Sequence, residues 1–237
     1  MRTTVTAGLL AAATCLALPV AAQTLIQTPT PSPRNEAGVG QHYRATVAEA
    51  QRRAMNGEPQ AAITLLAPVV AYCDAQQQRP NLGFVSVSTA AQYDRYMRTR
   101  GGAPVEWLDM ACTHSYYYTG YALVEQRKFE QALPYLSKAV ALAPYFPDAL
   151  NERGAALNQL GRLDEAEQNY RQVLALTQED SDAAYMAPLA WRGIGYGLIE
   201  KRDWAGARAA YETSLALDPG NSTALNELEF IRRNASK

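Results

Sequence analysis

The sequence predicts a mainly all-α fold, an α-α superhelical solenoid of stacked helix pairs with one small β-α-β insertion. The first observation is a 34-residue spacing between equivalent small and apolar residues: Gly120 and Gly154, Ala132 and Ala166, Leu142 and Leu176. The same set returns after one period plus seven inserted residues, at Gly195, Ala207 and Leu217. A fixed period of this length indicates two-helix units that bury their apolar faces against one another, and not around one closed core.

The composition is that of a folded protein. The chain has 237 residues, of which 48% are hydrophobic and 19% charged, and its formal net charge is −1. Neither charge forms a block, so nothing points to a nucleic-acid or anionic-membrane partner. Tyrosine is abundant, with 14 residues against 4 Phe and 3 Trp. Its ring and hydroxyl suit a partly wet contact surface.

Residues 1–22 are typical of a secretory signal peptide. Arg2 is the positive start, an apolar stretch covers 9–18, and the small residues 20–22 form a cleavage site. The alternative is a retained membrane anchor, but the apolar run is short for a bilayer span. We therefore expect cleavage and a periplasmic or secreted protein.

Cleavage would leave two cysteines, Cys73 and Cys112. An even pair in an exported chain is interpreted first as a disulfide. Closing this loop of 40 residues would contribute about 4 kcal/mol to stability in the chain-entropy model.

The region before the repeats divides into a linker and a helix pair. Residues 23–42 are rich in Pro and Thr and predict a disordered linker. Residues 43–76 predict a divergent helix pair, broken at Gly57, with Pro59 at the start of its second helix. Pro68 lies inside that helix and is expected to bend it.

Residues 77–112 predict the β-α-β insertion. Apolar and small polar residues alternate over 84–88, as in a half-buried strand. Thr89 and Gln92 form a capping box for a short helix. Residues 105–108 read as a second strand, and we expect Cys112 to tie the exit of the insertion back to Cys73.

Six positions repeat in each of three C-terminal units. They hold Tyr116, Gly120, Phe129, Ala132, Ala139 and Pro144, then Leu150, Gly154, Leu163, Ala166, Val173 and Gln178, then Trp191, Gly195, Trp204, Ala207, Ser214 and Pro219. With this pattern, residues 113–146, 147–180 and 188–221 resemble tetratricopeptide repeats. Gln178 and Leu163 depart from the usual Pro and aromatic residue. Residues 222–235 predict a capping helix that Ser222 or Thr223 begins and whose Leu225, Leu228 and Ile231 face inward.

The resemblance implies a binding groove, since in this family the first helix of each repeat lines a concave surface that binds peptides. The matching positions here are Tyr117, Tyr121, Asn151, Asn158, Arg192 and Tyr196. The tyrosines would offer stacking surface, and Asn151 and Arg192 could hold a peptide backbone or carboxylate. Packing is an equal alternative for Tyr121 and Tyr196, and the favoured one for Tyr116 and Tyr118. Chaperone-binding members use a Lys/Asn/Lys/Arg clamp, but the comparable positions here hold Tyr, Asn, Ala and Arg.

The resemblance therefore implies a non-catalytic scaffold that binds a peptide or a partner protein of unknown identity. With the export signal it suggests a cell-envelope complex of a Gram-negative bacterium. One alternative is a thiol enzyme that uses Cys112 and His114 near Asp109. Another is a self-assembling structural module. We expect no cofactor and no metal site, since His42 and His114 are the only histidines and no metal-binding or phosphate-loop motif is present.

Overall fold

The computed structural model describes residues 38–100 and 104–235. These residues belong to the second of the two units into which the chain divides, residues 31–237. Its elements are, in order, η1 (Gln41–Tyr43), α1 (Arg44–Met55), α2 (Pro59–Gln76), β1 (Gly83–Val85), α3 (Ala90–Thr99), β2 (Val105–Trp107), α4 (Met110–Glu125), α5 (Phe129–Leu142), α6 (Pro147–Gln159), α7 (Leu163–Glu179), η2 (Ser181–Met186), α8 (Ala187–Glu200), α9 (Trp204–Leu217) and α10 (Ser222–Asn234). The predicted signal peptide 1–22 lies outside the described residues.

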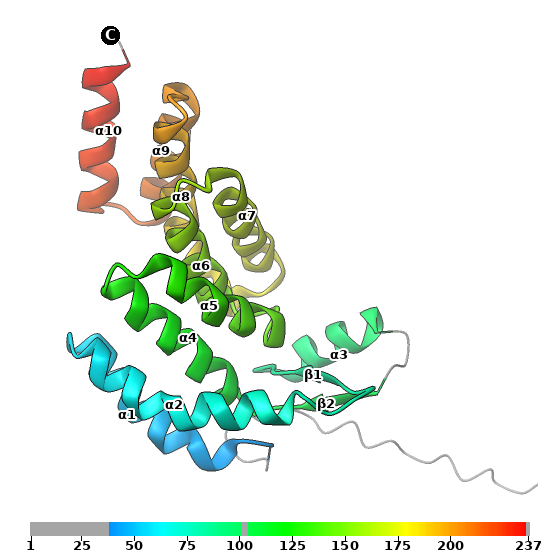
Figure 1. Ribbon diagram of the computed structural model, residues 1–237. Coiled ribbons are helices and arrows are strands. Elements are labelled where there is room, and N and C mark those ends of the chain that lie inside the picture. Colours follow the sequence, from blue (N-terminus) through cyan, green and yellow to red (C-terminus); the bar gives the residue numbers. More distant parts are fainter. Residues whose placement is uncertain (1–37, 101–103, 236–237) are drawn as a thin grey trace, which may run out of the picture. The chain divides into compact units, whose positions relative to one another are not determined.

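Successive antiparallel helix pairs stack on one another, so the predicted solenoid is confirmed. Figure 1 shows α4–α5, α6–α7 and α8–α9 following α1–α2 along the chain, with α10 beside α9. The seven inserted residues that lengthen one period, 181–187, contain η2, between α7 and α8. Each pair packs against the next, which is the arrangement that the 34-residue period predicts.

The repeating glycines mark where the two helices of a pair approach each other. A Cβ atom added to Gly120 would lie 2.6 Å from Leu136 Cγ, and one on Gly195 would lie 2.6 Å from Tyr211 Cε2. Each large residue comes 16 positions after its glycine and belongs to the second helix of the same pair. The period therefore records a steric requirement, because any side chain at these glycines would collide with the facing helix.

The turn inside each helix pair contains one residue in the left-handed conformation. The φ angles are +78° at Gly57, +58° at Arg127, +71° at Gly161 and +61° at Arg202. Glycine adopts this conformation without strain, whereas an arginine carries a cost of about 1–2 kcal/mol. Two of the four hairpins thus tolerate a strained turn, which shows that helix packing and not the turn residue sets the connection.

The chain before the first helix pair differs from the sequence prediction at the end of the linker. Residues 38–42, predicted as the end of a disordered linker, are ordered by contacts with the insertion. The Asp109 amide donates to the Val39 carbonyl oxygen at 2.9 Å, and Val39 forms a parallel bridge with Leu108. The linker residues 23–37 lie outside the described part. Helix α2 continues past Pro68 to Gln76.

The predicted insertion is confirmed as a small β-α-β unit. Strands β1 and β2 are parallel, with Phe84 opposite Glu106, and α3 connects them. The Thr89 hydroxyl caps α3 by accepting a hydrogen bond from the Gln92 amide at 3.2 Å. The Ser86 amide donates to the Leu142 carbonyl oxygen at 2.8 Å, which fixes the insertion to the end of α5.

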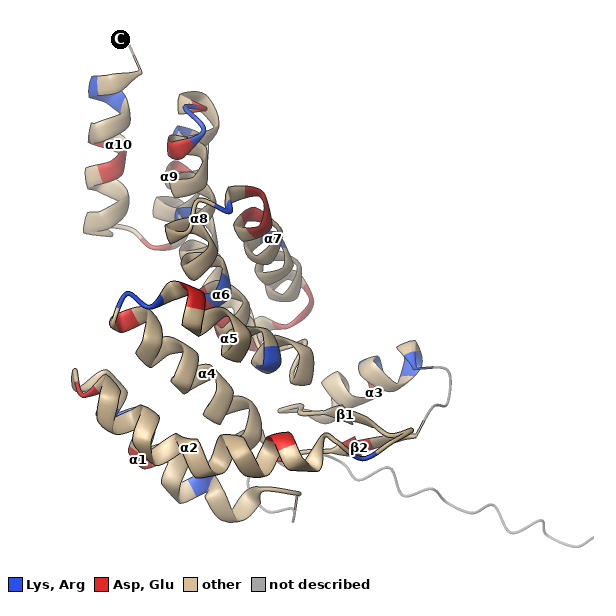
Figure 2. Ribbon diagram, viewed as in Figure 1, with Lys and Arg blue, Asp and Glu red and all other residues tan. Residues whose placement is uncertain are grey.

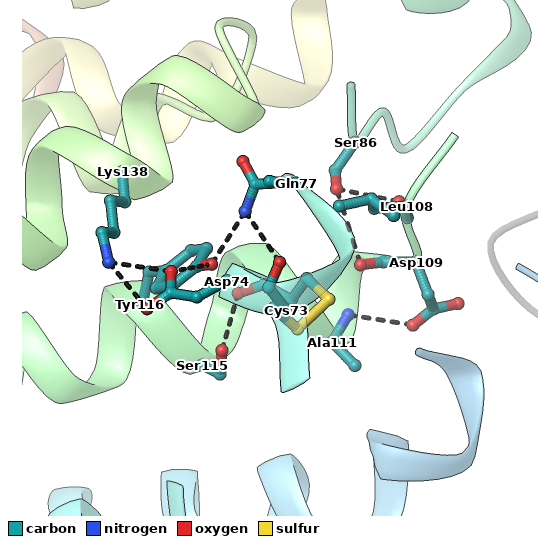
Figure 3. The surroundings of a disulfide bond; sticks show 11 residues. Cys73, Asp74, Gln77, Ser86, Leu108, Asp109, Ala111, Ser115, Tyr116 and Lys138 are labelled. Carbon is teal, nitrogen blue, oxygen red and sulfur yellow. Dashed lines mark hydrogen bonds and ion pairs between the residues drawn. A yellow bond between two sulfur atoms is a disulfide. The ribbon is translucent and has the colours of Figure 1, made fainter. Parts of the chain in front are cut away.

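A disulfide joins α2 to α4 beside a partly exposed polar cluster (Figure 3). Cys73 and Cys112 are bonded, with their Cα atoms 5.6 Å apart. One turn further along α4, the Tyr116 hydroxyl donates to Asp74 at 2.7 Å, and Lys138 of α5 donates to the same carboxylate at 2.8 Å. Tyr116 is fully buried, as the packing alternative predicted. These contacts lock α2, α4 and α5 together.

Helix α10 closes the C-terminal end, with a different cap from the one predicted. Ile231 is buried as predicted and Leu228 packs partly buried against the same cluster, but Leu225 does not face inward. Asn221, and not Ser222 or Thr223, caps the helix, because its side-chain oxygen accepts from the Ala224 amide at 3.1 Å. Ala224 and Ile231 are fully buried, whereas Leu225 is 50% exposed. Residues 224 and 231 are two helical turns apart and share one face, and 225 is rotated about 100° away from it.

Candidate functional site

The first helices of the repeats line a groove with a volume of about 690 Å³. Helices α4, α6 and α8 contribute most of its lining, α10 adds Thr223 and Glu227, and α7 and α9 add Tyr170 and Tyr211. Four of the six predicted groove residues line it: Asn151, Asn158, Arg192 and Tyr196. Asn151, Ala155 and Asn158 share one face of α6 because they are spaced by one and two turns.

Asn158 lines this groove and has a buried side-chain oxygen without a hydrogen-bond partner among the described residues. Its side-chain nitrogen donates to the Gly193 carbonyl oxygen at 3.0 Å and to the Tyr170 hydroxyl at 3.3 Å. A carbonyl oxygen can only accept, so this contact fixes which end of the amide is nitrogen. The Asn158 Oδ1 atom is left without a hydrogen-bond partner among the described residues, and the residue is only 6% exposed. A buried acceptor in this state is stabilised by any ligand that brings a donor.

Asn151 repeats the arrangement two turns earlier on α6. Its Oδ1 atom is also buried and finds no hydrogen-bond partner within the described part of the chain. The two amide oxygens are separated by seven residues, about 10 Å along the helix axis. The lining of the groove therefore contains two buried acceptors that the described residues do not satisfy.

Two glycines leave space for the ring of Tyr170 at the base of the groove. The ring of Tyr170 reaches from α7 between α6 and α8, where a Cβ atom on Gly154 or Gly193 would lie 2.8 Å or 2.2 Å from its Cζ atom. The ring can reach Asn158 only because both positions lack a side chain. Gly193 was not part of the repeat pattern, so this role comes from the structure.

Arg192 lines the groove but its charge is already matched. One of its terminal nitrogens donates to Ser214 Oγ at 3.2 Å and to Asp218 Oδ2 at 3.1 Å. The side chain thus links α8 to the end of α9. Tyr196, on the same helix, is partly buried, and this burial raises the pKa of its hydroxyl.

The structure places the two α4 tyrosines away from this lining. Tyr117 is buried in an aromatic cluster, with its ring centroid 4.9 Å from that of Tyr118 and 5.2 Å from that of Phe146. Tyr117 therefore packs in the core and does not offer a stacking surface. Tyr121 is half-buried at the edge of the cluster, with its ring centroid 6.3 Å from that of Tyr117. The sequence pattern alone does not separate these two roles.

Sequence reasoning missed an acidic group formed by Glu125 of α4, which lines the groove, and by Asp148 and Glu152 of α6, which do not. Burial, followed by repulsion from Glu125 and Asp148, raises the pKa of Glu152 to about 7. The Asp148 carboxylate accepts a hydrogen bond of 2.5 Å from the Tyr185 hydroxyl, and burial raises its pKa. A sequence signal exists in hindsight, since the neighbours of Glu152 at three and four residues are only Asp148 and alanines.

Elsewhere on the described helices, charges of both signs are interspersed, with no extended face of one sign (Figure 2). Many carboxylates pair within their own helix, as Glu229 does with Arg232 and Arg233. Glu152 differs from these because no described Lys or Arg forms an ion pair with it. The acidic group is therefore a local feature of the α4–α6 surface.

A second hollow, of about 430 Å³, lies between the insertion and the second repeat. Its polar side chains are largely satisfied by each other. The Gln92 side-chain nitrogen donates to Asp180 Oδ2 at 3.2 Å, and Arg95 pairs with Glu179 and lies 5.0 Å above the ring of Tyr145. This hollow reads as an interface that holds the insertion in place.

The residues of the alternative thiol-enzyme hypothesis are arranged for other roles. The Cys112 sulfur is bonded to Cys73, so it is no free nucleophile. Asp109 caps α4 through the Ala111 amide at 2.9 Å and accepts from Arg44 Nε at 2.8 Å. Burial lowers the pKa of His114 to about 4, and its ring packs against Phe146.

Two further properties hold for residues 38–100 and 104–235. No group of three or more His, Cys, Asp or Glu side chains there is arranged to hold a metal ion. Over the same residues, every helix is too short or too polar to span a membrane.

Comparison with known proteins agrees with this architecture. Residues 119–184 match the family model described as tetratricopeptide repeat. This segment covers α4 from Thr119 onward, α5, α6, α7 and most of η2. The described residues form a helical solenoid, and its middle part is similar to tetratricopeptide repeats.

Among curated proteins, the chain is 24% identical over 170 residues to the heat-shock protein cognate co-chaperone sgt12 of Aspergillus fumigatus, covering 71% of this chain and 46% of that protein. It is 33% identical over 102 residues to the Hsp70-Hsp90 organizing protein of Triticum aestivum, covering 43% of this chain and 16% of that protein. The chain thus spans less than half the length of either relative. Among solved structures, residues 41 to the end of MamA from Desulfovibrio magneticus match with a TM-score of 0.52 and 16% identity, covering 83% of this chain and 88% of that one. This likeness shows the fold alone.

Proposed function

We propose that this protein is a non-catalytic interaction scaffold that binds a peptide segment of a partner protein in the groove of α4, α6, α8 and α10. The observation that carries the proposal is the pair of unpaired amide oxygens of Asn151 and Asn158 on one face of α6. A peptide backbone supplies N–H donors at regular intervals, so it can satisfy acceptors in a row without depending on its side chains.

The relatives support the same class of function. The two curated proteins are a co-chaperone and a chaperone-organizing protein by name. The resemblance to tetratricopeptide repeats implies that a peptide binds in the groove. The clamp residues of chaperone-binding members are only half matched in this sequence, so the partner proposed here is not a chaperone tail.

A photo-crosslinking experiment tests the groove. A benzophenone amino acid would replace Tyr196 in the groove or Tyr135, a control that is equally part-buried but lies on the second helix α5. We expect crosslinked partner bands from position 196 and not from position 135, and expect an added Asn151→Ala change to remove them. Equal crosslinking from both positions, or bands that persist with Asn151→Ala, would contradict binding in the groove.

We also propose that the protein is exported to the periplasm or secreted and works in a cell-envelope complex. Residues 1–22 and the cysteine pair support this proposal, because disulfides persist in oxidising compartments. Mass spectrometry of protein from the envelope fraction should find a mature N-terminus at Gln23. A cytoplasmic protein that begins at Met1 would refute export.

The disulfide gives this proposal a stability test. Opening the bond between Cys73 and Cys112 releases a loop of 40 residues, which costs about 4 kcal/mol. For a unit of this size we expect dithiothreitol to lower Tm by roughly 8–16 °C. A Cys73→Ala/Cys112→Ala double variant should already melt lower and show no response to the reductant. A wild-type Tm that is insensitive to dithiothreitol would mean that the bond does not form in solution.

A second candidate is self-association, as a structural module. Large apolar side chains at the C-terminal end are exposed, with Leu217 at 53%, Leu225 at 50% and Phe230 at 46%. Light scattering across a concentration series would compare the wild type with a Leu225→Glu/Phe230→Glu variant. Oligomers that the variant loses would support this candidate, and a monomer at all concentrations would eliminate it.

A further inference from the structure

A third hollow, of about 490 Å³, is formed by α5, α6 and α7 and shares no lining residue with the groove. Its volume lies within the range of small-molecule sites, about 300–1,000 Å³. Leu133, Pro134 and Leu157 give it an apolar lining, and Ser137, Arg153 and Gln168 are among its polar side chains. The hollow therefore combines apolar surface with a guanidinium group.

Arg153 of α6 differs from the other partly buried cations of the described residues, which are arginines as well. Each of the others pairs with a carboxylate: Arg44 with Asp109, Arg95 with Glu179 and Arg192 with Asp218. Arg153 forms no ion pair with any described residue, and its only hydrogen bond there is to the neutral side chain of Asn169. Burial lowers the pKa of Arg153, because partial removal from water disfavours the charged form. A bound anion would compensate this charge.

Asn169 of α7 holds the guanidinium by one edge. The Asn169 side-chain nitrogen donates to the Glu165 carbonyl oxygen at 2.6 Å, which orients the amide so that its oxygen accepts from Arg153 Nε at 2.7 Å. The two terminal nitrogens of Arg153 form no hydrogen bond with the described residues and are not fully buried. The guanidinium is thus oriented with its terminal edge unengaged, and this edge can donate two parallel bonds to a carboxylate.

The two acids of the lining, Glu130 and Glu165, do not supply the missing partner. Glu165 accepts two hydrogen bonds of 2.7 Å from Arg162, and Glu130 also favours the charge of Arg162. Glu165 favours the charge of Arg153 as well, but from beyond ion-pair distance. The hydroxyl of Ser137 and the amide of Gln168 form no hydrogen bond with the described residues and remain as donors.

We propose that the hollow of α5, α6 and α7 binds a carboxylate attached to an apolar group, with the carboxylate on the terminal nitrogens of Arg153. One negative charge matches one unpaired guanidinium, whereas the second charge of a phosphate group would be repelled by Glu130 and Glu165. The apolar group would contact Leu133, Pro134 and Leu157. A free organic acid and the apolar C-terminal residue of a peptide share this chemistry. The proposal does not depend on binding in the groove.

The test titrates the isotope-labelled protein at pH 7 and physiological ionic strength, followed by NMR of backbone amides and arginine Nε–H groups. Hexanoate should shift the Arg153 Nε–H and Asn169 side-chain signals in a saturable way, with a Kd of about 1 mM. Hexanamide and inorganic phosphate should bind at least about tenfold more weakly. A second arm compares acetyl-Gly-Gly-Leu with its C-terminal amide. Tighter binding of the free peptide than of hexanoate assigns the carboxylate to a chain end, and the reverse order assigns it to a free acid.

Two variants and a matched control complete the test. Arg153→Lys keeps the charge but loses the paired donors, so it should weaken hexanoate about tenfold. Ser137→Ala removes an exposed hydroxyl from the lining and should weaken it about threefold, whichever way Arg153→Lys affects folding. Arg208→Gln on α9, which changes an exposed arginine without an ion pair to a described residue, should leave binding unchanged. Circular dichroism checks that each variant is folded.

Three results would overturn the proposal. The first is the absence of a saturable shift at Arg153 with either hexanoate or the free peptide. The second is equal binding of hexanoate and hexanamide, which would show that the carboxylate is not recognised. The third is hexanoate binding that the folded Arg153 and Ser137 variants retain in full, which would place the ligand elsewhere.

Discussion

Replacing Asn151 by alanine should make the protein more stable and less able to bind its partner. The side chain lies within α6, its Oδ1 atom is buried, and no hydrogen bond to it is formed by the described residues. The change therefore removes no favourable polar contact from the free protein. If the oxygen serves a bound peptide, its lack of a partner in the free protein is a cost to the fold.

The expected gain has two parts. Alanine exceeds asparagine in helix propensity by about 0.5 kcal/mol. Removing a buried acceptor that lacks a partner returns roughly 1 kcal/mol. A total near 1.5 kcal/mol corresponds to a rise in Tm of about 3–6 °C for a folded unit of some 200 residues.

Asn169 is the matched control. It is 5% exposed on α7, accepts from Arg153 Nε at 2.7 Å, and donates to the Glu165 carbonyl oxygen at 2.6 Å. Asn169→Ala should lose about 1–3 kcal/mol, because it leaves the partly buried guanidinium of Arg153 unpaired. Differential scanning calorimetry of both variants gives the comparison. A fall in Tm for Asn151→Ala comparable to that of the control would refute the reasoning, since it would mean that the Asn151 oxygen is already satisfied.

Two further predictions concern the groove floor and its titrating groups. Gly193→Ala should destabilise by about 1–3 kcal/mol, because its Cβ would lie 2.2 Å from Tyr170 Cζ, and a Tyr170→Leu background should relieve most of this loss in urea unfolding. The pKa of Glu152 is raised to about 7, so ionisation of this group destabilises the folded protein as pH rises from about 4.5 to 7. The pKa of His114 is lowered to about 4, so this group destabilises the folded protein as pH drops from about 6.5 to 4. The two effects oppose each other in the wild type between about pH 4.5 and 6.5, so Glu152→Gln should lose up to about 3 kcal/mol on acidification over this range, measured by urea unfolding at each pH. A variant whose stability is flat over this range would show that His114 is not held neutral.

The binding surface was only partly open to prediction. The 3.6-residue period places Asn151 and Asn158 on one face of a first helix, so their place in the lining of the groove follows from the sequence and the family resemblance. The same family resemblance assigned Tyr117 to the groove, where the structure instead buries it against Tyr118 and Phe146. Periodicity shows which residues share a face of a helix. How much of that face is buried depends on how the neighbouring helices pack against it.

The acidic group, too, could be predicted only in part from the sequence. The absence of a basic residue three or four positions from Glu152 was visible in the sequence. That Glu125, on another helix, approaches it and contributes to its raised pKa was not. Electrostatic perturbation depends on distances between helices, and these are set by side-chain volumes across the interface.

By itself the sequence determined the repeating architecture, because each period of 34 residues carries the small residues that two closely packed helices require. It also predicted the β-α-β insertion and the pairing of Cys73 with Cys112, since alternation, caps and cysteine number are local properties. Only the tertiary structure decided which polar groups are left without partners. Satisfaction of Asn158, Arg192 and Glu152 depends on groups that lie on other helices, so local patterns cannot reveal it.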